Sequence, residues 1–131
     1  MDLSIFDKEY QHKFVVTQEV YDAFQKCSSD RNPLHTNQEF ARSKGFPECV
    51  MYGNILNGFV SYFIGMLLPS PDVIIHSQDI DYKNPVFMGD ELDFTAKAEG
   101  ISEAVNVVVF KFKFRNKGKV VAKGHVQIGV I

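Results

Sequence analysis

The sequence predicts an α+β domain in which one antiparallel sheet wraps around a single long helix. Two observations lead to this fold class. An uncharged apolar segment occupies residues 52–68, and strand-like segments fill most of the chain after it. A first strand and short helices come before the apolar segment, so the order is strand, helices, then a run of strands. This order favours one sheet packed on one buried helix.

The central segment, residues 52–68, is predicted to be a helix that is buried on all sides. No charged residue occurs between Glu48 and Asp72, and apolar residues cover every face of a helical wheel. The alternative is a membrane span, which needs ~20 apolar residues. Polar or small residues interrupt the segment and prolines end it, which favours a core helix: Asn54, Asn57, Gly58, Ser61, Pro69 and Pro71.

The elements before the central helix follow from local signals. Residues 8–16 form a predicted first strand, and Thr17 is a good N-cap for a helix that runs to about Ser28. Residues 28–33 then form a turn, because a residue before proline is pushed toward extended geometry. Residues 37–44 are predicted to form a second short helix, which Gly45 ends.

The elements after the central helix are strands. Residues 73–82, 92–99 and 105–114 carry the apolar alternation of half-buried strands, and residues 120–131 return antiparallel to the third of these. The turn between the last two strands, residues 115–119, is rich in asparagine, glycine and cations.

Length and composition bound the class of protein. The 131 residues form one predicted domain, 1–131, and the net charge of −2 gives no general reason to expect nucleic acid or an anionic membrane as a partner. No secretory signal is visible at the N-terminus, so we expect a cytoplasmic protein. Cys27 and Cys49 lack metal-ligand spacing, and Cys27 continues an apolar helical stripe, so both are expected to be buried free thiols.

The segment Asp30-Arg31-Asn32-Pro33-Leu34-His35 carries the strongest chemical signal. A carboxylate and an imidazole on one proline-stiffened turn can lie on the same side of a cleft and exchange protons with water and a carbon acid. Gly53, at the expected start of the central helix, can offer an unpaired amide to a carbonyl that gains negative charge. On the residues alone, an Asp/His pair in such a loop is more often structural than catalytic, and Gly53 can equally serve only the tight packing of the helix entry.

Several segments resemble the MaoC-like (R)-specific enoyl-CoA hydratases, which are single hot-dog domains. The resemblance rests on residues 29–35, on Ala41, Phe46 and residues 50–53, and on residues 81–91. The last segment is similar to the family signature F-K-x-P-V-F-x-G-D, and the resemblance covers essentially the whole chain. It implies a sheet wrapped around a buried helix, as the order of segments also predicts.

The resemblance also implies roles for individual residues. Asp30 and His35 become the catalytic acid/base pair, and Gly53 becomes the amide donor to the thioester oxygen. Asn32 becomes the positioning partner of this pair, and the residues expected to bind the substrate are Asn32, Ser61 and Tyr52. The implied reaction is reversible hydration of trans-2-enoyl thioesters of CoA or an acyl carrier protein to the (3R)-3-hydroxyacyl thioesters, with no metal or redox cofactor.

The sequence departs from the family pattern where the central helix begins. The family usually has His-Gly there, whereas this chain has Tyr52-Gly53. The glycine amide is kept, but the role of the missing imidazole, either in shaping the pocket or in orienting the pair, is open. Ser29 stands where many members have glycine, and Asn57 and Gly58 replace more apolar residues.

Partners and alternative functions complete the expectations. The uncovered sheet edge predicts a homodimer, as the family implies. Cations of the last hairpin, Lys117 and Lys119 among them, are either a solvated surface or a contact for CoA phosphates or an acidic carrier protein. The alternatives to a hydratase are a hot-dog thioesterase and a non-catalytic subunit that binds acyl thioesters.

Overall fold

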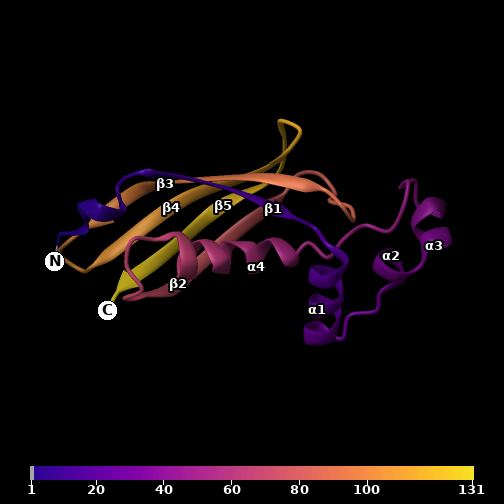
Figure 1. Ribbon diagram of the computed structural model, residues 1–131, viewed down its shortest axis with the longest axis horizontal. Helices are drawn as coiled ribbons and strands as arrows, with labels where there is room; N and C mark the ends of the chain where they lie inside the picture. The colour runs from indigo at the N-terminus through magenta and orange to yellow at the C-terminus, as the bar shows by residue number, and fades with distance from the viewer. Residues whose placement is uncertain (1) are drawn as a thin grey trace.

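A five-stranded antiparallel sheet wraps around one central helix in the computed structural model, which describes residues 2–131 (Figure 1). The strand order is β1-β3-β4-β5-β2, and every neighbouring pair is antiparallel. The strands are β1 (Glu9–Val15), β2 (Val73–Tyr82), β3 (Glu91–Ser102), β4 (Val107–Asn116) and β5 (Lys119–Val130). The helices are a 3-10 turn η1 (Leu3–Phe6), α1 (Gln18–Ser28), α2 (Pro33–Thr36), α3 (Gln38–Ser43), α4 (Ile55–Tyr62) and a π-helical turn η2 (Phe63–Leu67). The predicted α+β class and the hot-dog arrangement are confirmed.

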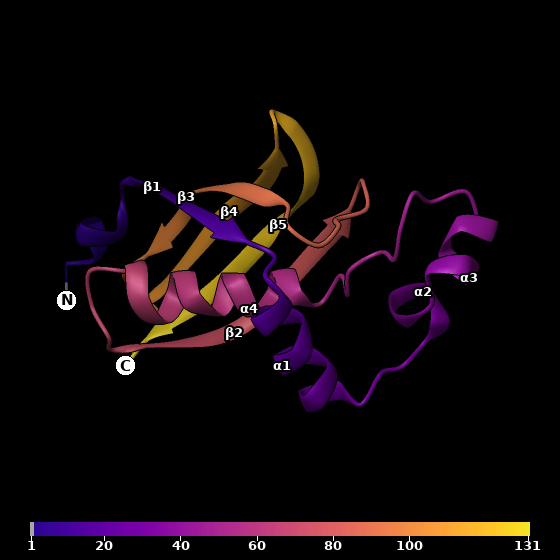
Figure 2. The ribbon, with the colours of Figure 1, turned by 45° about the vertical axis from the view of Figure 1, so that its right-hand side comes forward.

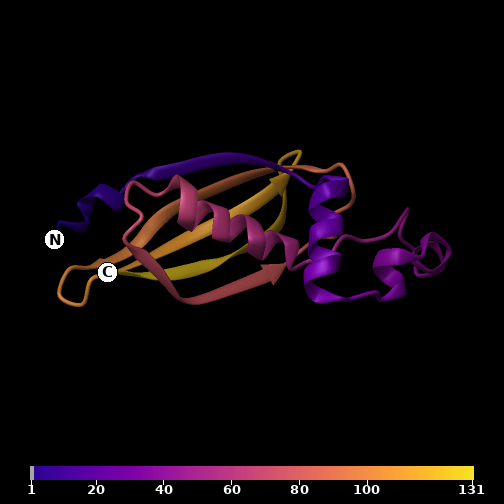
Figure 3. The ribbon, with the colours of Figure 1, turned by 60° about the horizontal axis from the view of Figure 1, so that its bottom comes forward.

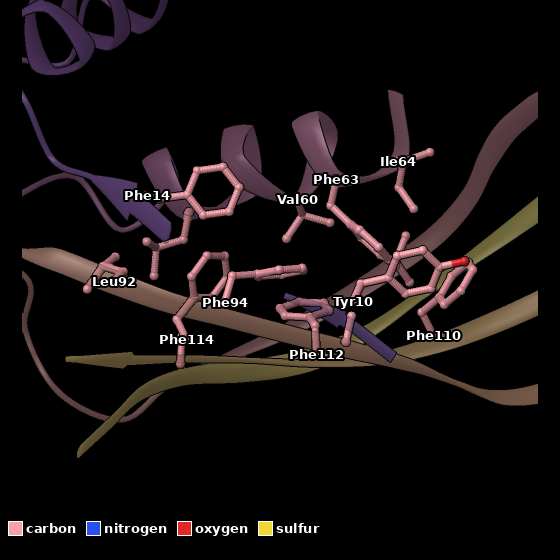
Figure 4. Packing of buried hydrophobic residues seen from close by; sticks show 14 of the residues in the cluster. Tyr10, Phe14, Val60, Phe63, Ile64, Leu92, Phe94, Phe110, Phe112 and Phe114 are labelled. Carbon is pink, nitrogen blue, oxygen red and sulfur yellow. The ribbon is translucent and has the colours of Figure 1, made fainter. Parts of the chain in front are cut away.

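Helix α4 lies along the concave face of the sheet, where the core is built mainly from aromatic rings (Figures 2 and 3). Figure 4 shows rings from β1, β3 and β4 between the helix and the strands. Phe112 is 1% exposed, and its ring lies 6.1 Å from that of Phe94 and 5.9 Å from that of Phe114. Every second residue of β4 contributes to this layer, so the period of two in the sequence produces the core.

The prediction that the central helix is buried on all sides is wrong for the single chain. Ile55, Leu56 and Val60 face the sheet and are buried, whereas Gly58 and Ser61 on the opposite side are exposed. The sheet wraps around one side of the helix, and no element formed by residues 2–131 covers the side that carries Gly58 and Ser61. Among residues 2–131, no helix is long and apolar enough to cross a membrane.

The short elements before α4 follow their predicted signals closely. The Thr17 side chain accepts a hydrogen bond from the Val20 N–H and caps α1, and Asn37 caps α3 through the Phe40 N–H. The sequence reading missed the short helix α2, because its single turn offers no apolar period.

The prediction that both cysteines are buried is wrong for one of them. Both thiols are free, and Cys49 is buried, but Cys27 is exposed. Helix α1 has no buried residue, because it extends past the end of the sheet and packs on one side only. An apolar stripe on a short helix therefore did not mean burial here.

The predicted strands are correct in number and order, although β3 is longer than the predicted residues 92–99 and β4 begins and ends two residues later than the predicted residues 105–114. The β4–β5 turn has positive φ at Lys117 (50°) and Gly118 (83°), the conformation that a two-residue hairpin with right-handed twist requires. This turn lies at the end of the sheet that is nearer α1 (Figures 1 and 3).

The two edges of the sheet differ in what they bury. Edge strand β1 alternates, with Tyr10 and Phe14 buried beneath α4. Edge strand β2 buries no residue fully, and its Ile74 and Ile75 are 52% and 39% exposed. Within the described part of the chain, the apolar surface of β2 therefore lacks a covering element.

Candidate functional site

The candidate site lies where the segment of residues 17–54, called the overhang from here on, joins the N-terminal end of α4. The overhang contains α1, α2 and α3 and projects beyond the sheet (Figure 1). Ser29 ends α1 in the left-handed conformation, with φ 58° and its N–H bonded to the Gln25 carbonyl. Ser29 thus adopts the left-handed conformation that glycine reaches more readily, and the resulting sharp turn brings Asp30 out of the helix.

Two side chains shape the turn that carries the predicted acid/base pair. Oδ1 of Asp30 accepts a hydrogen bond from the Asn32 N–H at 3.0 Å, and Oδ1 of Asn32 accepts one from the Leu34 N–H at 2.9 Å. The second bond caps α2, whose third residue is His35. Asn32 therefore acts on the backbone that positions His35. This contact favours a role in positioning the pair over a role in binding a substrate.

The orientation of the His35 ring is fixed by one strong hydrogen bond. Its Nδ1 lies 2.7 Å from the Val50 carbonyl oxygen. Because a carbonyl can only accept, Nδ1 carries the proton, and Nε2 of the neutral ring is left without one. His35 thus presents a nitrogen that can accept a proton. The Val50 carbonyl was missed by the sequence reading, since a backbone acceptor leaves no signal in residue types.

Gly53 precedes α4 and keeps its amide free. Its carbonyl accepts the first helical bond from the Leu56 N–H, but no acceptor for the Gly53 N–H is found within residues 2–131. The ring of Tyr82 lies against Gly53, and a Cβ at this position would come within 3.0 Å of Tyr82 Cε1. A side chain at position 53 would therefore press against the Tyr82 ring, which would have to shift by a few tenths of an ångström.

A groove of about 340 Å³ joins His35 and Gly53. Its walls come from the overhang, the start of α4 and the segment after β2: His35, Phe46, Val50, Met51, Gly53, Leu56, Tyr82, Lys83, Asn84, Pro85 and Val86. Of the predicted site residues, the structure brings His35 and Gly53 into this groove. Asp30 and Asn32 lie exposed on the adjoining turn, and Ser61 lies exposed further along α4, outside the groove lining.

Tyr82 was not singled out from the sequence, although it belongs to the motif of residues 81–91. Its hydroxyl hydrogen-bonds with Asn54 Oδ1 at 3.2 Å and with Asn57 Nδ2 at 3.3 Å. Burial raises the pKa of this phenol, so it stays a neutral donor at physiological pH. Asn57 thus ties the start of α4 to β2, which gives a structural reason for a polar residue at that position.

Tyr52 is buried, with 3% of its surface exposed, beneath the turn that carries Asp30. Its ring centroid lies 4.3 Å from that of His35, and its hydroxyl donates to the Asp30 carbonyl. The Tyr52 side chain therefore contacts the imidazole of His35 and the main chain of Asp30. Direct binding of a substrate by this side chain stays a prediction, and these contacts favour a role in holding the predicted pair.

No group of three or more His, Cys, Asp or Glu side chains suited to a metal ion occurs in residues 2–131. His35 and Gly53 bring an imidazole and a free amide to the groove, and the Asp30 carboxylate lies on the adjoining turn.

The sheet, the central helix and the groove together define a hot-dog domain with an acid/base site at one end of its helix. The sequence pattern of the MaoC like domain matches residues 6–120, so the chain belongs to that family. The same segment contains every predicted site residue.

Named relatives and solved structures are similar over most of the chain. The (R)-specific enoyl-CoA hydratase of Rhodospirillum rubrum is 32% identical over 107 residues, which cover 82% of this chain and 74% of the relative. A mitochondrial 3-hydroxyacyl-[acyl-carrier-protein] dehydratase of Arabidopsis thaliana is 29% identical over 110 residues, covering 82% of this chain and 65% of the relative. The unliganded R-hydratase PhaJ1 from Pseudomonas aeruginosa superposes with a TM-score of 0.85 at 25% identity, covering 95% of this chain and 80% of that one.

Proposed function

We propose that the protein catalyses the reversible addition of water to trans-2-enoyl thioesters of CoA or of an acyl carrier protein, which gives (3R)-3-hydroxyacyl thioesters. The observation that carries this proposal is that His35 and Gly53 line the same groove. The imidazole of His35 can accept a proton there, and the amide of Gly53 is free to donate a hydrogen bond. The relatives named hydratase and dehydratase support it, since those names describe the two directions of one reaction.

In the hydration direction, Asp30 and His35 hold one water molecule beside C3 of the enoyl group. As the water oxygen bonds to C3, one water proton passes to the pair, and the electrons of the double bond move toward the thioester oxygen. The pair then gives a proton to C2, and the thioester carbonyl is restored. One proton enters and one leaves, so the pair ends as it began.

Gly53 supplies the electrostatic part of this reaction. The enolate oxygen carries negative charge only in the transition state and intermediate, and a free N–H aimed at it stabilises that charge without reorganising. The N–H groups of Ile55, Leu56 and Asn57 at the start of α4 donate to the carbonyls of Tyr52, Gly53 and Asn54, so the Gly53 amide supplies this stabilisation by itself. The glycine at position 53 is kept free of a side chain by Tyr82, so the amide stays accessible from the groove.

The test is hydration of crotonyl-CoA by the purified protein, followed by the loss of enoyl absorbance. Asp30→Asn and His35→Ala should each lower kcat by about 10²–10⁴-fold, because each removes a group that moves a proton. Release of free thiol instead would identify a thioesterase. Absence of turnover on short, long and carrier-bound enoyl thioesters would identify a subunit that binds acyl thioesters without reaction.

We propose further that the active form is a homodimer in which a second copy covers β2 and the outer side of α4. The exposed apolar residues support this arrangement, since Met66 is 68% exposed and Ile74 is 52% exposed. Ser61 lies on the same exposed side of the helix, so a partner would enclose it. A place for Ser61 in the hydrogen bonds of the site is part of this proposal.

Light scattering after size exclusion tests the dimer. The wild-type protein should have twice the mass of one chain, and Ile74→Lys should shift it toward monomer. Val15→Lys is the matched control, because Val15 is 38% exposed on β1 at the opposite edge. A monomeric wild type, or equal dissociation by both variants, would contradict a dimer through β2.

A further inference from the structure

The main-chain carbonyls of Asp30 and His35 each accept a hydrogen bond from a tyrosine hydroxyl, and one glutamine side chain connects the two hydroxyls. The Tyr52 hydroxyl donates to the Asp30 carbonyl at 2.5 Å, and the Tyr21 hydroxyl donates to the His35 carbonyl at 3.0 Å. The Gln25 Nε2 group lies 3.2 Å from the Tyr52 hydroxyl and 3.1 Å from the Tyr21 hydroxyl.

The donor and the acceptor of every hydrogen bond in this set follow from the chemical groups involved. Each tyrosine hydroxyl has one proton and donates it to a carbonyl, so each hydroxyl can only accept from Gln25. The two protons of one amide nitrogen satisfy both hydroxyls at once. Tyr21 and Gln25 are four residues apart on α1 and therefore lie on one face of that helix, toward Tyr52.

We propose that Tyr21, Gln25 and Tyr52, the tyrosine bridge, form a positioning device that fixes Asp30 and His35 relative to one another. This inference rests on the proposed function, because it assigns positioning residues to that acid/base pair. Tyr52 has a second contact with the pair through its ring, which is tilted by 32° against the imidazole of His35.

The surroundings of the tyrosine bridge favour positioning over ordinary packing. The turn at Asp30 is exposed, and α1 has no fully buried residue, although its Tyr21 and Phe24 rings lie 5.4 and 4.9 Å from the ring of Tyr52. Partial burial and the neighbouring Tyr52 raise the pKa of Tyr21, which keeps its hydroxyl protonated and able to donate. The main-chain carbonyl of each residue of the pair accepts from one of the two hydroxyls, and a shift of about 1 Å at a reacting group costs on the order of 100-fold in rate.

Removal of single hydroxyls tests the proposal. Tyr52→Phe and Tyr21→Phe keep the rings and should each lower kcat by about 10-fold while KM changes less than about twofold, because positioning acts on the transition state. The double variant should lose less than the product of the two effects, since Gln25 joins both hydroxyls into one unit.

Tyr10→Phe is the matched control. Tyr10 is also a buried tyrosine, 5% exposed, and its hydroxyl also donates to a main-chain carbonyl, that of Phe6 at 3.2 Å. It lies at the start of β1, at the end of the sheet away from the overhang. This variant should lose stability as the others do and keep the kcat of the wild type.

A second readout does not depend on activity. The ¹³C resonance of the Asp30 carbonyl should move in Tyr52→Phe and that of the His35 carbonyl in Tyr21→Phe, and neither should move in Tyr10→Phe. Unmoved carbonyl resonances, or a kcat in Tyr52→Phe equal to that in Tyr10→Phe, would overturn the positioning role. A wild type that hydrates no enoyl thioester would instead defeat the proposed function, and the carbonyl resonances would still decide whether the tyrosine bridge holds the turn.

Discussion

The sheet with its central helix and the overhang are held together by different forces. The largest fully buried side chains, Phe110, Phe112 and Phe114 among them, all lie outside residues 17–54. The overhang buries few residues, and helix caps, the Val50 carbonyl and the tyrosine bridge fix its shape. Burial of apolar area stabilises the first region, whereas directional hydrogen bonds specify the second.

This difference separates stability from chemistry in the molecule. A packed aromatic core tolerates little change of volume but gives no reactive group a free face. The overhang leaves Asp30 and one nitrogen of His35 accessible, but its conformation depends on a few hydrogen bonds. Changes in the core should therefore affect folding first, and changes in the overhang should affect turnover first.

The largest effect on stability is expected from the core. Phe112→Ala should lower the free energy of unfolding by about 3–5 kcal/mol, because it leaves a cavity beside Phe94 and Phe114. Phe40→Ala in α3 is the control, since Phe40 is only partly buried, and it should cost about 1 kcal/mol or less. Urea unfolding measures both, and equal losses would erase the distinction between the two regions.

A moderate effect on turnover is expected from the cap of α2. Asn32→Ala should cost about 1 kcal/mol of stability through the lost cap, and should lower kcat by about 10- to 100-fold because His35 loses its position. Asn37→Ala removes the same kind of cap from α3, which carries no residue of the site. Its kcat should stay close to that of the wild type, and parallel losses in both variants would assign Asn32 to folding alone.

A smaller effect is expected at the β4–β5 turn. Charge reversal at Lys117 and Lys119 should raise KM by about 2- to 5-fold and leave kcat unchanged, if exposed cations there meet a phosphate or an acidic carrier. Lys8→Glu, before β1 at the opposite end of the sheet, should leave KM as it is. The steady-state KM measures this, and an unchanged value in the double reversal would leave the turn as a solvated surface.

The smallest effect concerns the two thiols of the overhang, which differ in burial. Burial raises the pKa of Cys49, the Glu48 carboxylate raises it further, and Arg42 partly opposes the shift. Less of this thiol is ionised at a given pH, so iodoacetamide at pH 8 should label the exposed Cys27 first and Cys49 only on unfolding. Mass spectrometry of the labelled peptides measures this order, and equal labelling in the folded protein would contradict it.

Much of the fold could be predicted because its signals are local. The alternation in β4, the Thr17 cap and the hairpin turn each depend on residues a few positions apart, and all three were found where expected. The burial of α1 and of the outer side of α4 could not be predicted in the same way. An apolar or small residue indicates which face of a helix can be buried. Whether another helix or strand covers that face depends on how the whole chain folds.

The sequence by itself determined the five strands and the longer helices, their order and the residue types of the site, because periodicity, caps and the Asp30–His35 motif depend on neighbouring positions. Only the tertiary structure decided how these groups act together. The Val50 carbonyl sets the protonated nitrogen of His35, and Tyr52 reaches Asp30 from 22 residues away in the chain. Such contacts depend on distances and directions between atoms of separate elements, which the packing of the folded chain creates.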